Sequence, residues 1–302
     1  MTRLDRSADA GALAWLVSVG ADEAIGEEPV DRLPTVALRS GRMEASPPPA
    51  RRITSGEGSP PSRERAYDEV PLRVLPLDRG GSGGGLPAAP PEIPLGTPEA
   101  AESARDLAAA CQSLDELKDA IARFDGLTLK ATATNLVFAD GNPKARLMLV
   151  GEAPGAEEDR RGLPFVGAAG QLLDRMLAAI GHDRSNSYIT NIVNWRPPGN
   201  RKPSPAEMLL CRPFIERHIA LVDPAVLVLL GDTSAKTLTN RNEGITRLRG
   251  RWFTWTNPTT GQDIPLMPTF HPAFLLRSPG QKREAWIDLL AIKQKLMELN
   301  ER

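Results

Sequence analysis

Apolar side chains recur along the chain at two spacings, which together predict an alternation of helices and strands. Apolar residues three or four positions apart predict helices, and this spacing covers residues 114–124, 172–180, 205–220, 233–238 and 282–299. Short continuous apolar runs predict buried strands, and such runs cover residues 146–150, 188–193 and 225–230, followed by a hairpin of 252–255 and 264–267. Strands that alternate with helices predict an α/β fold, a three-layer α/β/α sandwich with a mostly parallel, four-stranded central sheet.

Local signals mark the ends of two of these helices. Ser204 is followed by Pro205 and Glu207, which is the pattern of a helix N-cap, a first-turn proline and the acid of a capping box. Gly181 follows the apolar face of residues 172–180, and glycine is preferred just past a helix C-terminus. These two boundaries are therefore predicted independently of the hydrophobic pattern.

The first third of the chain differs in composition from the rest. Residues 1–105 hold 14 of the 28 prolines and carry 12 Lys and Arg against 16 Asp and Glu. The sequence predicts a short helix over 10–25 and then a Pro- and Gly-rich disordered linker over about 26–98, which buries too little apolar surface to offset its chain entropy. We therefore expect an N-terminal extension over 1–105 and a globular domain over 106–302. The apolar patch Leu13–Val19 either docks on that domain or recruits a partner protein.

Composition excludes several classes of protein. No apolar run approaches the roughly 18–20 residues that span a bilayer, and Leu13–Val19 lacks the basic flank of a signal peptide. The two cysteines are too few for a disulfide framework and fit a reducing, cytoplasmic compartment. The three histidines do not have the spacing of zinc ligands. We therefore expect neither a membrane association nor a bound metal.

Polar residues follow the predicted strands, where parallel sheets present their loops to ligands. The first strand runs into Gly151–Asp159, which carries a cluster of carboxylates. That loop lacks both the Gly-Lys-Ser/Thr of a phosphate-binding loop and the three-glycine dinucleotide fingerprint. The second strand carries Asn191 and leads into Arg196–Arg201, and the last strand runs into His271. We expect these carboxylates, the amide and the imidazole to meet in one crevice.

Five strings at these positions resemble the uracil-DNA glycosylase superfamily, most closely its family-4 branch. They are GEAPGAEED at 151–159, GLPFVGAAG at 162–170, YITN at 188–191, WRPPGNR at 195–201 and HPAFLLR at 271–277. The resemblance covers about residues 110–300, with the strings in order and at the family's spacing. It implies an enzyme of base-excision repair that extrudes uracil from DNA into a pocket. The N-glycosidic bond is then hydrolysed, which leaves an abasic site.

The resemblance implies that several residues recognise uracil. Phe165 would stack on the flipped base, and the amide of Asn191 would pair with uracil O4 and N3. Glu158 would close off the C5 edge, where thymine carries its methyl group. The main chain of the first loop would also hold the base, through Gly151, Ala153, Pro154 and Gly155.

The resemblance implies three catalytic residues, namely Glu152, His271 and Asn191. Asn191 is the residue that also binds the base. His271 would face uracil O2 and stabilise negative charge on the departing base. Glu152 would position or activate water and offset the positive charge on the sugar. None of the five strings contains a lysine placed for Schiff-base chemistry, so the implied enzyme is a monofunctional glycosylase that does not cut the strand.

Contacts with DNA are implied beside the pocket. Arg277 and the histidine loop would enter the minor groove, with Leu275 or Leu276 as an apolar wedge. Arg196 and Arg201 are also expected to contact DNA. Further basic residues cluster in the sequence nearby, at Arg241, Arg247, Arg249, Arg251, Lys282 and Arg283. The globular domain carries a net charge of only +3, which predicts modest, salt-sensitive affinity.

One departure from the family concerns its iron–sulfur cluster. Relatives bind a [4Fe–4S] cluster through four cysteines, and three of those sites correspond here to Phe124, Leu127 and Trp195. Only Cys211 remains, and one thiolate cannot hold a four-iron cluster. We therefore expect an iron-free protein without a cofactor, in which the three apolar residues pack in place of the cluster.

The expected partner is DNA that contains uracil, single- or double-stranded, bound by a monomer. Two other functions stay open. A protein of this fold could capture uracil-DNA without turnover, although the Lys- and Arg-rich insert of a covalently trapping relative is absent here. The chain could also be a repair scaffold whose N-terminal arm recruits repair or replication proteins.

Overall fold

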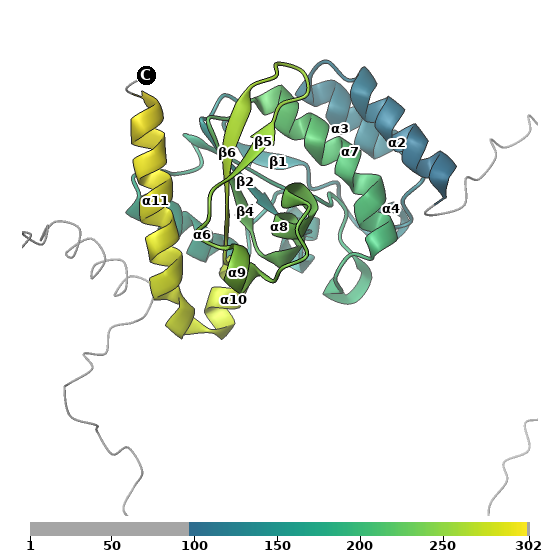
Figure 1. Ribbon diagram of the computed structural model, residues 1–302. Coiled ribbons are helices and arrows are strands. Elements are labelled where there is room, and N and C mark those ends of the chain that lie inside the picture. Colours follow the sequence, from purple (N-terminus) through teal and green to yellow (C-terminus); the bar gives the residue numbers. More distant parts are fainter. Residues whose placement is uncertain (1–96, 301–302) are drawn as a thin grey trace, which may run out of the picture. The chain divides into compact units, whose positions relative to one another are not determined.

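The computed structural model describes residues 97–300, which form the body shown in Figure 1. The helix expected over 10–25 lies outside the described residues, and so does the expected linker apart from its last two positions. Within the described part, no helix is long and apolar enough to cross a membrane.

Six strands form one mixed sheet. They are β1 (Ala139–Gly141), β2 (Leu147–Gly151), β3 (Ser187–Asn191), β4 (Val226–Leu230), β5 (Phe253–Thr256) and β6 (Asp263–Thr269). Their order across the sheet is β1-β3-β2-β4-β6-β5. The four central strands are parallel, and the two edge strands pair antiparallel with their neighbours. The four-stranded parallel sheet expected from the sequence is therefore the centre of a larger mixed sheet.

Three of the described helices precede the first strand, others lie in the connections between strands, and the last two follow β6. The helices are α2 (Pro98–Ala110), α3 (Leu114–Arg123), α4 (Leu129–Thr132), α5 (Ala156–Arg161), α6 (Ala168–Ala179), α7 (Pro205–Val222), α8 (Asp232–Thr239), α9 (Ile245–Leu248), α10 (Pro272–Arg277) and α11 (Lys282–Asn300), with 3₁₀ turns η1 (Pro198–Asn200) and η2 (Pro279–Gln281). The capping box predicted for α7 is present. Ser204 Oγ accepts a hydrogen bond from the Glu207 N–H at 3.2 Å, and the Glu207 carboxylate accepts one from the Ser204 N–H at 2.7 Å.

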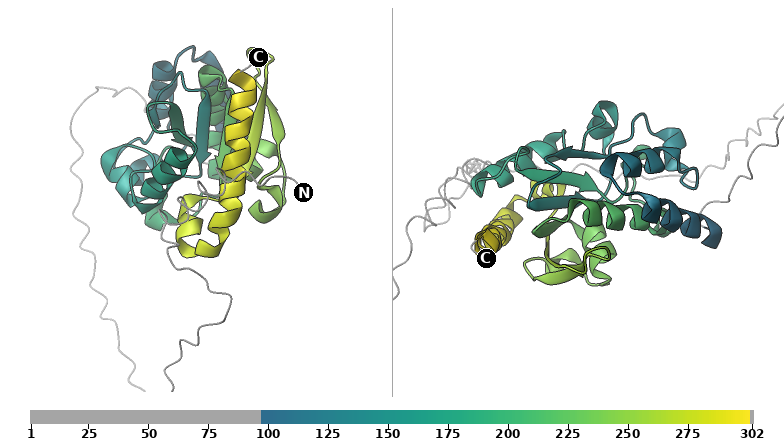
Figure 2. Two further views of the ribbon diagram at one scale, coloured as in Figure 1. Left: turned by 90° about the vertical axis from the view of Figure 1, so that its left-hand side faces the viewer. Right: turned by 90° about the horizontal axis from the view of Figure 1, so that it is seen from above.

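Alternate residues along the central strands face two opposite layers of helices. On β2, Met148 and Val150 pack in one apolar cluster with α2, α3 and α7, while Leu147 and Leu149 pack in a second cluster with α6 and α11. Figure 1 shows α11 across the sheet from α2, α3 and α7, and in Figure 2 α11 runs alongside β6, which it contacts. The α/β/α sandwich expected from the sequence is confirmed.

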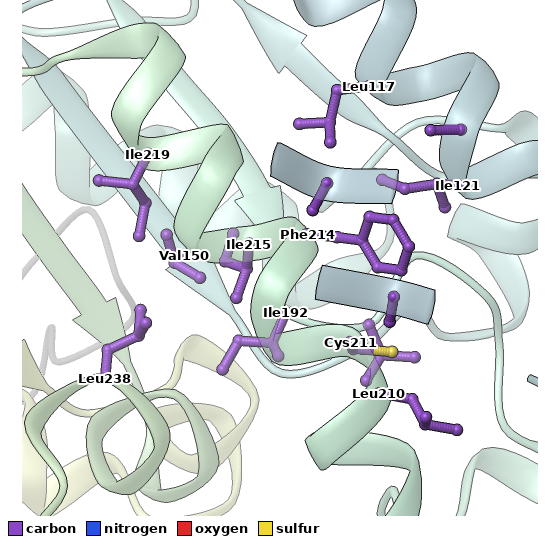
Figure 3. Packing of buried hydrophobic residues seen from close by; sticks show 14 of the residues in the cluster. Leu117, Ile121, Val150, Ile192, Leu210, Cys211, Phe214, Ile215, Ile219 and Leu238 are labelled. Atoms are coloured by element: carbon purple, nitrogen blue, oxygen red, sulfur yellow. The ribbon is translucent and has the colours of Figure 1, made fainter. Parts of the chain in front are cut away.

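The cluster on the α7 side fills the space between the helices and the sheet (Figure 3). Phe214 and Ile215 of α7 lie between Ile121 of α3 and two residues on the sheet side, Val150 of β2 and Ile192 just after β3, and all five are buried. Burying one such side chain contributes on the order of 1.5–3 kcal/mol relative to leaving it exposed. This layer is therefore a main source of the stability that holds the strand ends in place.

Several elements are not predicted by the hydrophobic pattern. α2 begins at Pro98, so the boundary expected after residue 105 falls within a helix. The buried face of α2 consists of alanines, which give a weak hydrophobic signal although their small size lets α2 pack on α7. β1 has only three residues, and α5 and α10 are six-residue helices in segments expected to be loops.

A buried ion pair joins Asp288 on α11 to Arg249 just after α9, and Asp288 also accepts a hydrogen bond from Thr269 at the end of β6. Arg249 donates from Nε to Asp288 Oδ2 at 2.9 Å, and Thr269 donates to the same oxygen at 2.6 Å. Arg249 also donates from Nη1 to Glu284 at 2.7 Å. Asp288 is fully buried and Arg249 is 14% exposed, and Lys282 is buried as well. Of the basic residues that cluster in the sequence near the hairpin and the histidine loop, Arg249 and Lys282 are therefore largely buried and do not form an exposed basic surface.

Replacing Arg249 by Met should lower the free energy of unfolding by about 3–5 kcal/mol, because the buried Asp288 carboxylate then lacks its cation. Urea denaturation measures the change. Arg251→Met is the matched control, since it removes an exposed guanidinium that lies over the Phe253 ring at 5.4 Å. That variant should lose no more than about 1 kcal/mol. Equal losses in the two variants would contradict the importance of the Arg249 pair.

Candidate active site

Four residues that end or follow the parallel strands meet at one edge of the sheet. Gly151 ends β2 and lies in register beside Asn191, which ends β3. Thr233 follows β4, and His271 follows β6. Because these strands are parallel neighbours, their carboxyl ends open onto the same crevice.

The crevice contains a pocket of about 200 Å³. Pockets for drug-sized ligands measure roughly 300–1,000 Å³, so this one suits a single small ring. Its lining includes nine of the residues expected from the sequence: Glu152, Ala153, Pro154, Gly155, Glu158, Phe165, Asn191, Arg201 and His271. Four lining residues were not expected, namely Ala169, Pro197, Asn200 and Ala273. All four lie within the strings that carry the family resemblance, which was the signal that could have identified them.

The Asn191 side chain is buried and has an unsatisfied oxygen. Only 2% of the residue is exposed, and its Oδ1 has no hydrogen-bond partner among the described residues. A buried carbonyl without a donor costs roughly 1–3 kcal/mol. A Cβ at position 151 would lie 2.3 Å from this oxygen, so only glycine leaves room for it. Asn191 also lines the pocket, so its amide, with this unpaired acceptor, is placed to hydrogen-bond a ligand there.

Phe165 forms an apolar wall of the pocket in an uncommon backbone conformation. Its φ is +54°, in the left-handed region that bulky residues rarely adopt. The ring lies 5.4 Å from the His271 ring with an interplanar angle of 30°. Its Cζ would lie only 2.6 Å from a Cβ at position 151. The Phe165 ring therefore lies against Gly151 and His271, where it can stack on a flat ligand.

His271 is neutral at pH 7 and donates from a defined nitrogen. Its Nδ1 accepts a hydrogen bond from the Ala273 N–H at 3.1 Å, so the neutral ring carries its proton on Nε2. Burial lowers the pKa of His271 to about 4, with a further lowering by the charge of Arg277 and an opposing effect of Glu158. His271 therefore offers an uncharged N–H donor.

The Glu158 carboxylate connects the loop after β2 to the loop before α6 through hydrogen bonds. Its Oε1 accepts hydrogen bonds from the N–H groups of Val166 and Gly167 at 2.9 Å each. Its Oε2 accepts one from the Gly155 N–H at 3.1 Å. These charge-assisted bonds orient the carboxylate. Glu158 lines the pocket, and its expected role at the C5 edge of a base stays a prediction.

A hydrogen bond from Thr233, which was not among the residues expected at the site, holds the Glu152 side chain. Thr233, in the first turn of α8, donates from Oγ1 to Glu152 Oε2 at 2.5 Å. This hydrogen bond orients the carboxylate at the pocket. Thr233 follows a parallel strand, and the rule that ligands bind at the carboxyl ends of such strands could have indicated it.

The leucines expected to act as a DNA wedge differ in exposure. Leu276 is 42% exposed on α10, whereas Leu275 is fully buried in the core. Of the two leucines expected as alternatives for the wedge, Leu276 is therefore the exposed one, and its contact with DNA stays a prediction. Arg277, at the end of the same helix, is exposed. Leu276 and Arg277 therefore present the surface beside His271.

Hydrogen bonds fix two arginines in the loop after β3, of which Arg201 lines the pocket. Arg196 donates from Nε to Asn200 Oδ1 at 2.7 Å. Arg201 donates from both terminal nitrogens to the Glu207 carboxylate, at 2.8 and 2.6 Å. These hydrogen bonds lower the pKa of Glu207 to about 2. Contact of either arginine with DNA stays a prediction.

The positions that correspond to the cluster ligands of relatives are buried. Phe124, Leu127, Trp195 and Cys211 all belong to the α7-side apolar cluster, and the Phe124 ring lies 5.3 Å from the Phe214 ring. Cys211, labelled in Figure 3, is a free thiol whose pKa burial raises to about 12. Among residues 97–300, no three His, Cys, Asp or Glu side chains are grouped to hold a metal ion. This donor set does not fit a four-iron cluster.

The chain belongs to the uracil DNA glycosylase superfamily, whose family model matches residues 138–290 and so spans all the pocket-lining residues. It is 37% identical over 187 residues to the type-4 uracil-DNA glycosylase of Sulfurisphaera tokodaii, covering 60% of this chain and 84% of that one. The type-4 enzyme of Thermotoga maritima is 41% identical over 151 residues, 50% of this chain and 76% of the relative. A type-5 uracil-DNA glycosylase of Thermus thermophilus is 34% identical over 113 residues, which cover 32% of this chain and 51% of the relative. The resemblance to the superfamily and its family-4 branch is confirmed.

The His271 imidazole should stay neutral down to about pH 5 and titrate near pH 4, which a histidine NMR titration measures. An ordinary histidine titrates near 6.5, and here burial and Arg277 both disfavour the proton. The unfolded chain takes up this proton at higher pH than the folded chain, so the His271 contribution to stability falls as pH drops from about 6.5 to 4. Arg277→Gln should raise the pKa of His271, and a wild-type titration near 6.5 would contradict the assignment.

Proposed function

We propose that this protein is a monofunctional uracil-DNA glycosylase, which flips uracil out of DNA and hydrolyses its N-glycosidic bond to leave an abasic site. One observation carries the proposal. Asn191 lines a pocket that suits one small ring, and its buried Oδ1 lacks a donor among the described residues. The similarity to type-4 uracil-DNA glycosylases supports the same function.

In the proposed complex, Asn191 reads the edge of the base. Its Oδ1 accepts from uracil N3–H, and its Nδ2 donates to uracil O4. Cytosine has an acceptor at N3 and an amino donor at position 4, so both groups of Asn191 would face the wrong partner. A site whose buried polar groups are left unpaired by the wrong substrate discriminates strongly. Phe165 stacks on the face of the ring.

His271 acts on the leaving group. As the glycosidic bond breaks, its electron pair goes to uracil and negative charge collects on O2. The Nε2–H of His271 is a fixed donor for this oxygen, and donors held ready for developing charge stabilise transition states. Because the ring is neutral, uracil departs as an anion that this hydrogen bond stabilises.

Glu152 acts on the sugar. Its carboxylate, oriented by Thr233, offsets the positive charge of the oxocarbenium ion and positions a water. The water oxygen bonds to C1′ and its proton is released through the carboxylate. No lysine lines the pocket among the described residues, so a Schiff base does not form and the strand stays intact.

We further infer that this chemistry proceeds without an iron–sulfur cluster, because Cys211 is the one thiol at the corresponding positions. Leu276 and Arg277 are the exposed groups that would hold the DNA open from the minor groove. The monomeric state stays a prediction. Recruitment of a repair or replication protein by the N-terminal arm also stays one, because the arm lies outside the described residues.

An oligonucleotide assay tests the function. Strands with one uracil or one thymine, single- and double-stranded, are incubated with the full chain and EDTA at low salt, and half of each sample is treated with hot alkali. We expect cleavage at uracil alone, only after alkali, by protein that contains no iron. An uncleaved adduct that survives denaturation would favour covalent capture instead. No reaction with any strand would overturn the proposal.

Asn191→Ala should lower kcat/KM for uracil release by about 10²–10³-fold, a loss typical of one polar group in an active site. It should not lower the free energy of unfolding, because the variant removes an unpaired oxygen. Asn194→Ala is the control, since its buried amide donates to the Val137 carbonyl at 3.0 Å outside the pocket. This control should be less stable but nearly as active below its melting temperature. Retained turnover in Asn191→Ala would remove Asn191 from the site.

Thr233→Val should lower kcat by about 10- to 100-fold with little change in KM, because a misplaced catalytic group loses rate rather than binding. Thr233→Ser keeps the hydroxyl and should restore most of the rate. Thr237→Val is the matched control, since Thr237 donates to the Thr233 carbonyl one turn along the same helix. If Thr233→Val and Thr237→Val behave alike in single-turnover kinetics, the hydroxyl does not position Glu152.

A further inference from the structure

Arg184 connects distant parts of the body behind the pocket. It lies in the turn between α6 and β3, with a quarter of its side chain exposed. Its Nε donates to Asp174 on α6 at 2.9 Å, and its Nη1 donates to Asp140 on β1 at 2.5 Å. Charge-assisted bonds to two carboxylates fix the position of the planar guanidinium.

The same guanidinium holds two carbonyl groups of a pocket loop. Nη1 also donates to the Pro164 carbonyl at 3.1 Å, and Nη2 donates to the Phe165 carbonyl. Arg184 itself does not line the pocket. It therefore touches the backbone of Phe165 from behind, while the Phe165 ring faces the pocket.

The peptide unit between Phe165 and Val166 is held at both ends by opposite charges. Arg184 binds its carbonyl oxygen, and Glu158 Oε1 accepts a hydrogen bond from its N–H at 2.9 Å. Because a peptide unit is planar, fixing both ends fixes the plane. The carbonyl also lies so close to α6 that a Cβ at Gly170 would come within 1.6 Å of its oxygen.

These hydrogen bonds at both ends of the peptide unit explain why Phe165 keeps an unfavourable backbone conformation. A φ of +54° persists in a bulky residue only where the surroundings over-determine it. Arg184 on one side and Glu158 on the other supply that constraint. Without Arg184, Phe165 would relax toward negative φ and turn its ring away from the pocket.

We propose that Arg184 is a positioning residue that fixes the Phe165 ring as the stacking surface for the flipped base. The inference rests on the proposed function. Arg184 governs base binding more than bond cleavage, because Phe165 touches the face of the base whereas His271 and Glu152 face the reacting atoms.

The test measures the KM for uracil-containing DNA and the inhibition constant for free uracil. Arg184→Met should raise both by about five- to tenfold, a part of what base stacking on an aromatic ring contributes. The pH profile should not change, and kcat should change less than KM. Arg146→Met is the matched control, since Arg146 donates to the Leu299 carbonyl at 3.0 Å away from the pocket. It should leave both constants unchanged.

A double-mutant cycle with Phe165→Leu separates positioning from general destabilisation. Once the aromatic ring is gone, Arg184→Met should raise the inhibition constant for uracil little further, and additive effects would overturn the proposal. Arg184→Lys keeps a cation between the two aspartates, so the chain stays folded, but it lacks the planar fork that reaches both carbonyls. An unchanged inhibition constant in Arg184→Lys and Arg184→Met would also overturn it. A wild-type chain that releases no uracil would contradict the proposed function instead.

Discussion

The pocket depends on the absence of a side chain at Gly151. Neighbouring strands lie only about 4.8 Å apart, and Gly151 is directly beside Asn191 in register. A Cβ at position 151 would overlap both the Asn191 oxygen and the Phe165 ring. With glycine, an amide and an aromatic face can share one strand end. The recognition of a small flat ring is therefore built on a single backbone position.

Around that position, charged and neutral groups have different tasks. The ionic side chains of Glu158, Arg184 and the Arg201–Glu207 pair hold backbone or loop segments in place. The groups that face the centre of the pocket from Asn191, Phe165 and His271 carry no charge. Under the proposed function, a small base would enter without displacing an ion pair, and Glu152 would act as the carboxylate for the sugar.

The sequence predicts the centre of the fold well and its edges poorly. Continuous apolar runs identify the buried parallel strands, and the polar residues after them identify most of the pocket. The Ala-rich α2 escapes prediction because its buried face is weakly hydrophobic. Leu275 and Leu276 are chemically identical, and only the orientation of α10 decides which is exposed. Likewise, charge alone does not reveal that Arg249 faces a carboxylate 39 positions away.

The unpaired oxygen of Asn191 lowers the stability of the empty protein but serves the proposed discrimination between bases. An apolar residue at this site would make the empty protein more stable, because it would leave no buried acceptor without a donor. If Asn191 discriminates bases as proposed, selection for heat tolerance and selection for base discrimination act in opposite directions on this one side chain. Stability lost there has to be recovered elsewhere, in apolar layers such as the α7 cluster. Core positions far from the pocket thereby limit how selective the pocket can become.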